Sequence, residues 1–324
     1  MELLHRKLEQ FDGKRIASGP ELTFLECVLH QSDLLEERGS ESYRQFNALA
    51  AQVKRFEKTY GKVFVEKIDM EFLQNWIQFL QISKFGRDGK SYTKNYIWNS
   101  VQMIKGVLYR AKDRGEQVNP IVFSHQFKAP SEEAFNIYLN KSKLEKIANC
   151  RLQARYVTTR DLFIIQAYTG LRYSDISTIS MSNIKDGCLT KVQVKTGGKV
   201  SIPLHPLVLD IIKLYEGKLP KAKSNNGMNQ DLKVIGEAAG LTEIISKTRV
   251  EGGKRVTREF PEHDLIFTHT GRRSFCTNSY LDGVPILSIM SLSGHKTIAS
   301  FMKYIKIGEK ELTDSLKGHP FFSR

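Results

Sequence analysis

The sequence has few cysteines, and none of them lie close together. Its four cysteines, Cys27, Cys150, Cys188 and Cys276, form no Cys-x-x-Cys pair and are separated by long stretches of chain. A zinc ribbon needs closely spaced thiolates, and a disulfide framework is typical of short secreted chains that are dense in cysteine. The spacing therefore excludes both classes and predicts reduced thiols that are mostly packed in the interior.

The sequence also lacks a long apolar run. It contains no uncharged apolar stretch of about 18 residues and no apolar signal core near the N-terminus. Internal repeats and low-complexity tracts are absent as well. We therefore expect no membrane span and, by default, a cytoplasmic protein that associates with the nucleoid.

Acidic residues are the minority among the charged ones. The 324 residues include 49 Lys and Arg against 35 Asp and Glu, which gives a formal net charge of +14. Such a balance implies a polyanionic partner, and nucleic acid is the commonest one for a basic chain. Because 40% of the residues are hydrophobic and the length exceeds that of a typical domain, we expect two domains with substantial cores.

Helical periodicity dominates the first part of the chain. After an arm at residues 1–20, apolar residues recur at helical spacing in four segments. Gly61 is expected to end the second helix, Asp69 to cap the third and Ser91 to cap the fourth. The pattern predicts a compact all-α domain over residues 21–115.

Two of these helices also carry basic and amide side chains at helical spacing. A solvated surface explains them as well as a grip on a nucleic-acid backbone does, because Lys, Arg and Asn supply many phosphate contacts. The residues concerned are Arg44, Asn47, Lys54, Arg55, Lys94, Asn99, Lys105 and Lys112.

The pattern changes after a linker at residues 116–131. Apolar and polar residues alternate on both sides of a Thr-Gly-Gly turn, which predicts a β-hairpin over residues 191–203. The polar segment 221–227 is expected to be a loop, and the basic segment 247–258 either a second hairpin or a loop. The predicted fold is mainly α with small β-hairpin elements, in which an α+β domain over residues 132–324 follows the all-α domain.

Five residues in this second part have the types and order that phosphodiester chemistry without a metal needs. They are Arg172, His269, Arg272, His295 and Tyr304. Tyrosine is a weak nucleophile at its reference pKa of about 10, and the negative charge of a phosphodiester repels attack. Guanidinium groups neutralise the phosphate with a planar fork, and histidines hydrogen-bond and pass protons near neutral pH. We therefore expect a catalytic centre with no metal and no cofactor.

The segments around these residues resemble the signature of the tyrosine recombinase, or phage integrase, family. They are Thr169-Gly-Leu-Arg-Tyr-Ser-Asp175, His269-Thr-Gly-Arg-Arg-Ser-Phe275, and Ser293-Gly-His295 followed by Tyr304. The resemblance extends from about residue 131 to the C-terminus, and the four-helix domain is similar to the core-binding domain of that family. The ordered set is far more specific than any one of its motifs.

The resemblance implies a role for each of the five residues. Arg172 and Arg272 would hold the non-bridging oxygens of the scissile phosphate, and His269 would hydrogen-bond the phosphate or help deprotonate the tyrosine. Tyr304 would attack phosphorus and leave a 3′-phosphotyrosine and a free 5′-hydroxyl. His295 would contact the same phosphate or support Tyr304.

The leaving 5′-oxygen needs a proton, which a lysine on a hairpin can donate as general acid. Lys195 matches the hairpin lysine of the family, and Lys199 on the returning strand is the alternative. Asp175 resembles an acidic residue that orients a catalytic side chain in the family. Gly271 and Arg273 depart from the pattern His-x-Leu-Arg-His, so any role of a second histidine there is absent.

The family also implies partners, which are double-stranded DNA and a homotetramer on paired DNA sites, with accessory DNA-bending proteins as an option. Subunits would exchange their C-terminal segments, for which the tail offers apolar anchors at Leu312, Leu316, Phe321 and Phe322. Many integrases also carry an arm-site DNA-binding domain, so either this protein is of the simpler type or the sequence begins after that domain.

The resemblance thus implies a site-specific recombinase for the integration, excision or inversion of a DNA element. Two alternatives remain open. One is a topoisomerase of type IB, which relaxes DNA with similar residues, and the other is a catalytically silent DNA-binding regulator.

Overall fold

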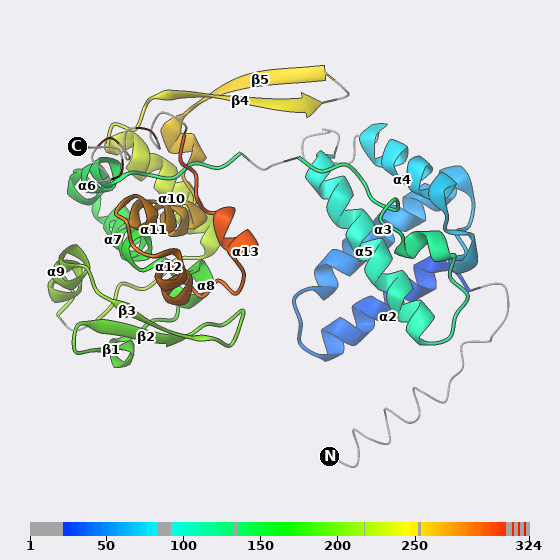
Figure 1. Ribbon diagram of the computed structural model, residues 1–324, viewed down its shortest axis with the longest axis horizontal. Helices are drawn as coiled ribbons and strands as arrows, with labels where there is room; N and C mark the ends of the chain where they lie inside the picture. The colour runs from blue at the N-terminus through cyan, green and yellow to red at the C-terminus, as the bar shows by residue number, and fades with distance from the viewer. Residues whose placement is uncertain are drawn as a thin grey trace, which may run out of the picture. The chain divides into compact units, whose positions relative to one another are not determined.

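The structure is a computed structural model, and its chain is mostly helical with small antiparallel sheets (Figure 1), which confirms the predicted fold class. The chain divides into two compact units near residue 133. The arm at residues 1–20, Ser91, Leu312, Leu316 and Phe322 lie outside the described part of the chain. The described residues are 22–82, 92–132, 135–216, 218–251 and 254–308, together with 313, 317 and 321.

In its described residues, the first unit is a bundle of four helices. They are α2 (Phe24–Glu37), α3 (Tyr43–Tyr60), α4 (Met70–Ile82) and α5 (Lys94–Asp113). The short 3₁₀ helix η1 (Val65–Lys67) lies between α3 and α4, and η3 (Pro120–Phe123) follows α5. Their apolar faces meet around Trp76, which is fully buried and donates its indole N–H to the hydroxyl of Ser100 at 3.0 Å. This hydrogen bond satisfies the one polar group of the indole in an otherwise apolar core.

Local sequence signals set the ends of these helices. The carboxylate of Asp69 accepts the backbone N–H of Phe72 at 2.9 Å, which confirms it as the cap of α4. Gly61 ends α3 with φ of 82°, as expected. The prediction for the fourth helix was wrong, because the N-cap of α5 is Thr93, whose hydroxyl accepts the N–H of Tyr96 at 3.2 Å. Serine and threonine are both preferred N-cap residues, so the sequence alone did not distinguish Ser91 from Thr93.

Two of the basic side chains on the polar faces of these helices are tied to their own unit. The ammonium of Lys105 donates to the carbonyl oxygens of Ser124 at 3.2 Å and Phe127 at 3.3 Å. The ammonium of Lys112 lies 4.6 Å from the ring centroid of Phe123. Lys105 therefore holds the segment after α5 in place, which is a structural role.

The second unit is built around one buried helix. Helix α7 (Ala154–Thr169) is flanked by α11 (Thr268–Leu281), α10 (Asn225–Ala238) and α6 (Lys141–Asn149). Every side chain from Leu162 to Ala167 is buried, so this segment carries no polar face to solvent. The remaining elements are α8 (Tyr173–Ile176), η4 (Met181–Asn183), α9 (Pro206–Leu214), η5 (Glu262–Leu265), α12 (Ile286–Ser293) and α13 (Ile298–Met302).

Two antiparallel sheets complete the second unit. The strands β1 (Ile184–Lys185), β2 (Cys188–Val192) and β3 (Lys199–Pro203) form one sheet, in which Val192 pairs with Lys199. This sheet confirms the predicted hairpin. The strands β4 (Ile244–Glu251) and β5 (Lys254–Pro261) form the other, so the basic segment 247–258 is a hairpin and not a loop.

The prediction of a loop over residues 221–227 was partly wrong, because α10 begins at Asn225. The hydroxyl of Ser224 accepts the N–H of Gly227 at 3.2 Å and caps the helix. Polar residues and glycine are common both in loops and in the first turn of a helix, which explains the error.

All four cysteines are free thiols, with Cys27 and Cys276 buried. No described helix is long and apolar enough to cross a membrane.

Trp76 is the central side chain of the first core, so its truncation tests how that unit is stabilised. We expect Trp76→Ala to lower the free energy of unfolding of the first unit by about 3–5 kcal/mol, because a large cavity replaces the indole. Denaturant unfolding of the full chain, followed by circular dichroism, measures this loss. Ser100→Ala is the matched control, since it keeps the indole and removes only the hydroxyl that accepts its N–H and donates to the carbonyl oxygen of Ile97, so it should cost about 1–3 kcal/mol. A Trp76→Ala protein as stable as wild type would contradict this account of the core.

Candidate active site

The end of α7 positions the first arginine of the site. Gly170 follows α7 in the left-handed conformation with φ of 67°, and a Cβ atom there would lie 2.4 Å from the ring of Phe275. Only glycine satisfies both conditions. Two residues later, Arg172 takes the N-cap position of α8. The chain therefore turns sharply between α7 and α8, and this turn fixes the backbone that carries Arg172.

Helix α11 buries the second arginine completely. Arg272 has an exposed fraction of 0%. Its Nη1 donates to the carbonyl oxygen of Gly170 at 2.5 Å, and its Nη2 donates to Nε2 of His295 at 2.9 Å. Its guanidinium carbon lies 5.2 Å from the ring centroid of Tyr304. The guanidinium thus connects the turn after α7, the segment after α12 and the tyrosine.

The charge of Arg272 has no carboxylate beside it. Within the described residues, Arg272 takes part in no salt bridge, and its Nε has no hydrogen-bond partner. Burial, and next the neighbouring charge of Arg172, lower the pKa of Arg272 from its ordinary value. A guanidinium nevertheless stays protonated in proteins. An isolated buried cation is costly, so this position suits an anionic ligand.

His295 follows α12 and is held in one tautomer. Because Arg272 can only donate, Nε2 of His295 must accept, and the ring proton lies on Nδ1. That Nδ1 donates to the hydroxyl of Ser293 at 2.7 Å, and the hydroxyl donates to the carbonyl oxygen of Ile289 at 2.6 Å. The chain of donors ends in the helix backbone. His295 is therefore neutral.

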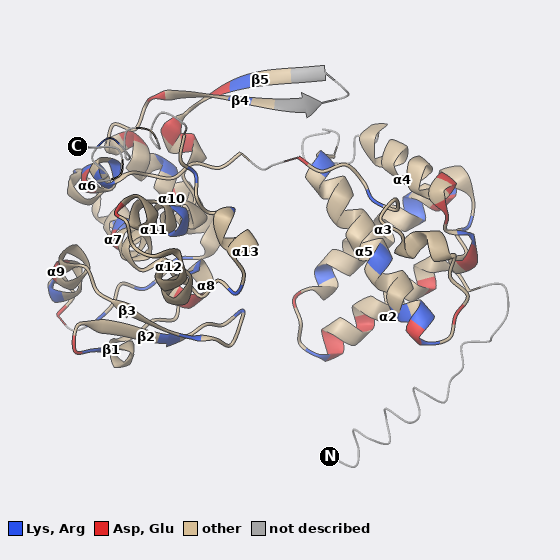
Figure 2. Cartoon of the chain, in the orientation of Figure 1, with Lys and Arg blue, Asp and Glu red and all other residues tan. Residues whose placement is uncertain are grey.

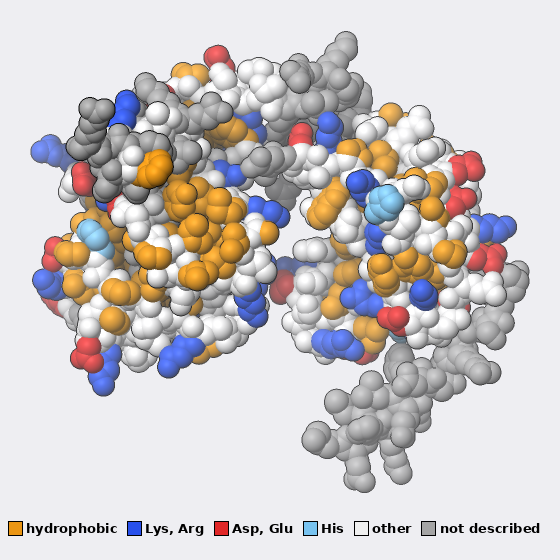
Figure 3. Space-filling view, viewed as in Figure 1, with side chains coloured by type: hydrophobic (Ala, Val, Ile, Leu, Met, Phe, Trp, Pro, Cys, Tyr) orange, Lys and Arg blue, Asp and Glu red, His pale blue; other side chains and the backbone are white. Residues whose placement is uncertain are grey.

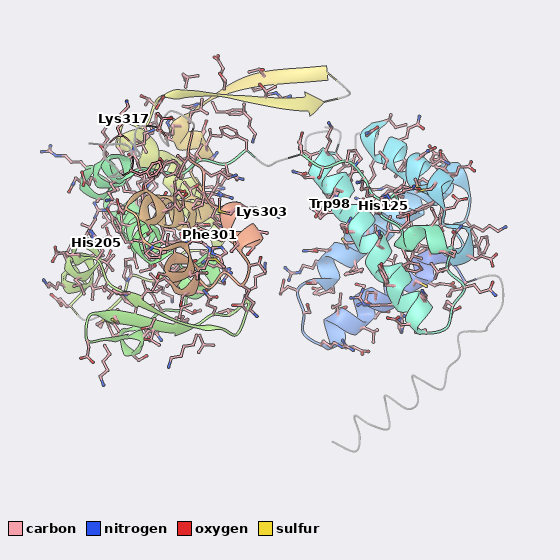
Figure 4. All side chains as sticks on the ribbon, in the orientation of Figure 1. Trp98, His125, His205, Phe301, Lys303 and Lys317 are labelled. Atoms are coloured by element: carbon pink, nitrogen blue, oxygen red, sulfur yellow. The ribbon has the colours of Figure 1, made fainter. Side chains whose placement is uncertain are left out.

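Tyr304 is the second residue after α13 and points at a histidine of α11. Its hydroxyl is 2.9 Å from Nε2 of His269. Its backbone carbonyl accepts the hydroxyl of Thr277 at 3.1 Å, which ties the segment to α11. Phe301 on α13 is fully buried and anchors this helix, and Lys303 follows it at the surface (Figure 4). The tyrosine hydroxyl and the imidazole are therefore in position to exchange a proton.

Both histidines are neutral near pH 7 for the same physical reason. Burial, followed by the charges of Arg273 and Arg272, lowers the pKa of His269 to about 4. Burial, followed by the charges of Arg272 and Arg172, lowers the pKa of His295 to about 3. Neutral His269 can accept a proton from Tyr304, which an imidazolium cannot do.

Arg172 is held by one neutral and one acidic side chain. Its Nη1 donates to Oε1 of Gln193 at 2.9 Å and lies 4.0 Å from Oδ2 of Asp175. Asp175 is fully buried, and its other oxygen accepts the backbone N–H of Val194 at 2.8 Å. Asp175 therefore contacts both the first arginine and the β2–β3 hairpin.

The β2–β3 hairpin carries two candidate lysines. Lys195 and Lys199 are both exposed, and in the described part of the chain no hydrogen bond joins either of them to the five residues above. The charge of Lys195 is a lesser cause, after burial and the arginines, of the lowered pKa of His269. Lys199 lies on β3, paired with Val192, and is not among those causes.

The structure therefore brings together Arg172, His269, Arg272, His295 and Tyr304, as the sequence predicted, and leaves Lys195 at the edge of the site. Sequence reasoning missed three contributors: Gln193, the hydroxyl of Ser293, and Arg273, whose charge acts on His269. Gln193 stands at a polar position of the alternating segment 191–195, so no pattern in the sequence marked it as a buried residue of the site. Within the described residues, no group of three or more His, Cys, Asp or Glu side chains is arranged to hold a metal ion.

Comparisons with known proteins match both units. A model of the "Phage integrase family" matches residues 137–311, and a model of the "Phage integrase SAM-like domain" matches residues 23–120. The chain is 24% identical over 269 residues to "Tyrosine recombinase XerC" of Rickettsia bellii (strain OSU 85-389), which covers 79% of this chain and 82% of the relative. It is 22% identical over 262 residues to the protein of the same name from Rickettsia canadensis, covering 76% and 78% of the two chains.

Solved structures show the same fold. A lambda integrase dimer bound to a COC′ core site matches with a TM-score of 0.63 and 16% identity, covering 88% of this chain and 96% of the other. The integrase of the Tn1549 transposon in complex with circular intermediate DNA matches with a TM-score of 0.61 and 14% identity, covering 91% and 99%.

The lowered pKa values of the two histidines give a measurable consequence. Well above pH 6.5, both rings are neutral in the folded and unfolded chain. As pH falls from there toward about 4, the unfolded chain takes up protons that the folded site refuses, so stability decreases with falling pH. In an NMR titration of the imidazole signals, assigned with His269→Asn and His295→Asn proteins, neither ring should titrate between about pH 8 and 5. A midpoint near 6.5 for either ring would contradict the neutral assignment.

Proposed function

Because the chain belongs to the phage integrase family, we propose that it is a site-specific recombinase that cuts and rejoins double-stranded DNA through a 3′-phosphotyrosine. The outcome would be the integration, excision or inversion of a DNA element. The relatives named tyrosine recombinase support this reaction class.

One observation carries the proposal. The fully buried guanidinium of Arg272 has no carboxylate partner among the described residues and lies 5.2 Å from the ring of Tyr304. Arg172 provides a second cation from the turn after α7. A phosphodiester placed against both arginines would supply the missing anion and present its phosphorus to the tyrosine. Cationic donors that are fixed before the reaction stabilise the extra charge of the transition state most effectively.

Strand cleavage then follows from the contacts of Tyr304. The phenol oxygen attacks phosphorus, and its proton passes to Nε2 of neutral His269, which is 2.9 Å away. A bond between phosphorus and the tyrosine forms while the bond to the 5′-oxygen breaks. The energy of the phosphodiester is kept in the covalent link, so a 5′-hydroxyl of a second strand can reverse the step and rejoin the DNA.

The 5′-oxygen leaves as a hydroxyl only if it receives a proton. Lys195 is the proposed donor, because its charge acts on His269 and its hairpin is tied to Arg172 through Asp175. Lys199 remains the alternative on the same hairpin. DNA contacts would extend over both units, because Lys and Arg side chains occur on each of them (Figure 2).

The proposed assembly is a homotetramer on two paired DNA sites. A lambda integrase tetramer has been solved on a Holliday junction, which supports this arrangement by analogy. The space-filling view shows hydrophobic side chains gathered on one face of the second unit (Figure 3). The exposed large hydrophobic residues of this unit include Leu287 of α12 and Ile298 and Met302 of α13. Such a surface suits a contact between subunits.

The first test concerns the nucleophile. Tyr304→Phe should abolish the covalent adduct with a nicked suicide substrate, because it removes the attacking oxygen, and should leave DNA affinity nearly unchanged. The substrate is a duplex with the inverted repeats that flank the gene, and the adduct is measured on a denaturing gel. Tyr280→Phe is the matched control, since Tyr280 packs against the same small core as Tyr304 and should still form the adduct. An adduct with the Tyr304→Phe protein would show that another residue attacks.

The second test distinguishes the two lysines. Lys195→Ala should cripple cleavage of an ordinary phosphodiester but be largely rescued by a 5′-bridging phosphorothiolate, whose thiolate leaves without a proton. Lys199→Ala is the matched control and should cleave both substrates at similar rates. Single-turnover rates with each substrate measure the difference. Rescue of the Lys199→Ala protein alone would reverse the assignment.

A further inference from the structure

Gln193 is a buried glutamine at the meeting point of three segments of the site. Its exposed fraction is 1%. Its Oε1 accepts Nη1 of Arg172 at 2.9 Å and the hydroxyl of Thr196 at 2.8 Å, and its Nε2 donates to the carbonyl oxygen of Ser293 at 3.1 Å. One amide therefore connects the first arginine, the lysine hairpin and the segment that leads to His295.

The backbone of Gln193 also fixes the start of the hairpin turn. Its N–H donates to the carbonyl oxygen of Gly198 at 2.9 Å, and its carbonyl oxygen accepts the N–H of Gly197 at 2.9 Å. Lys195 lies inside this closed turn, two residues away. The position of Gln193 thus determines where the turn with Lys195 lies relative to Arg172.

The side-chain amide of Gln193 packs directly against Gly294. A Cβ atom at Gly294 would lie 2.2 Å from Oε1 and 2.5 Å from Nε2 of Gln193, and Gly294 has φ of 70°. Any larger residue there would displace the amide. Gly294 joins Ser293 to His295. Its close contact with the amide of Gln193 restricts the amide to an orientation in which it hydrogen-bonds both Ser293 and Arg172.

The neutral charge of this amide is as important as its position. A carbonyl oxygen orients a guanidinium without cancelling its charge, whereas a carboxylate at the same place would form an ion pair with Arg172. The full charge of Arg172 then remains for an anionic ligand, apart from Asp175 at 4.0 Å.

We propose that Gln193 is a positioning residue that holds Arg172, the hairpin with Lys195 and the Gly294–His295 turn in one fixed arrangement around the scissile phosphate. This inference rests on the proposed recombinase function. In this role, Gln193 neither contacts the DNA nor transfers a proton. Its effect is to set the distance between the general acid and the phosphate-binding arginine.

The test uses the full chain and compares two leaving groups. Gln193→Met keeps the length of the side chain but removes its three hydrogen bonds, and it should slow cleavage of the ordinary suicide substrate by roughly 10²-fold, the scale for a misplaced catalytic group. A 5′-bridging phosphorothiolate should recover part of this loss, because the displaced Lys195 is then no longer needed. DNA affinity should stay close to that of wild type.

A second buried glutamine offers a matched control. Gln166 is also fully buried in the same unit, and its Nε2 donates only to a backbone carbonyl, that of Leu171 at 2.9 Å. Gln166→Met should lower the melting temperature of the protein about as much as Gln193→Met does. Relative to wild type, however, it should change the cleavage rates of the two substrates by the same factor. Selective rescue in the Gln193→Met protein alone supports positioning of the general acid. The inference would be overturned if the phosphorothiolate recovered none of the activity lost in Gln193→Met. It would also be overturned if the phosphorothiolate rescued Gln166→Met to the same extent.

Gln193→Glu tests the charge and keeps the shape, so it remains informative if the Met protein folds poorly. Its carboxylate should bind Arg172 in place of the phosphate and slow cleavage of both substrates by roughly 10²-fold, the scale for losing one transition-state donor. The loss relative to wild type should shrink as pH falls and the carboxyl group becomes neutral. A Gln193→Glu protein as active as wild type at neutral pH would contradict the proposal. Failure of wild type itself to form an adduct would instead reject the proposed function, so the two failures are distinguishable.

Discussion

The site depends on one buried cation without a carboxylate partner among the described residues. Arg272 is fully enclosed, yet its hydrogen bonds go to a backbone carbonyl and to a neutral imidazole. Removing a guanidinium from water costs several kcal/mol, and these neutral acceptors offset only part of that cost. The folded chain therefore carries an unfavourable local charge that a phosphate would relieve. Folding thus places a desolvated cation in the site, and its unpaired charge would favour the binding of an anion.

The scaffold around Arg272 has to be stable enough to hold this charge. Helix α11 packs against α7, whose residues Leu162–Ala167 are entirely buried, so the guanidinium extends from one of the most protected parts of the unit. Gly170 lets α7 end within reach of Nη1, and the close ring of Phe275 excludes a side chain there. The position of the cation is thus a consequence of helix packing.

Much of this arrangement could be predicted from the sequence, because its signals are local. The cap at Asp69, the end of α3 at Gly61 and the hairpin over 191–203 each depend on a few neighbouring residues. The five central site residues were found from chemical type and order. Gln193 could not be found in that way, because its partners are 21 and 100 positions away in sequence and only the folded chain brings them together. The tautomer of His295 likewise depends on Arg272 in another helix.

In this site, the residues that supply positive charge differ from the residue that accepts the proton. The arginines supply positive charge that does not titrate, while burial and these same charges keep His269 and His295 neutral. A neutral His269 can take a proton from Tyr304, and neutral acceptors such as Gln193 orient the cations without cancelling them. If the histidines carried the charge instead, the site would lose either its base or its affinity for phosphate as pH changed. Separating the two tasks lets one arrangement serve both cleavage and rejoining near neutral pH.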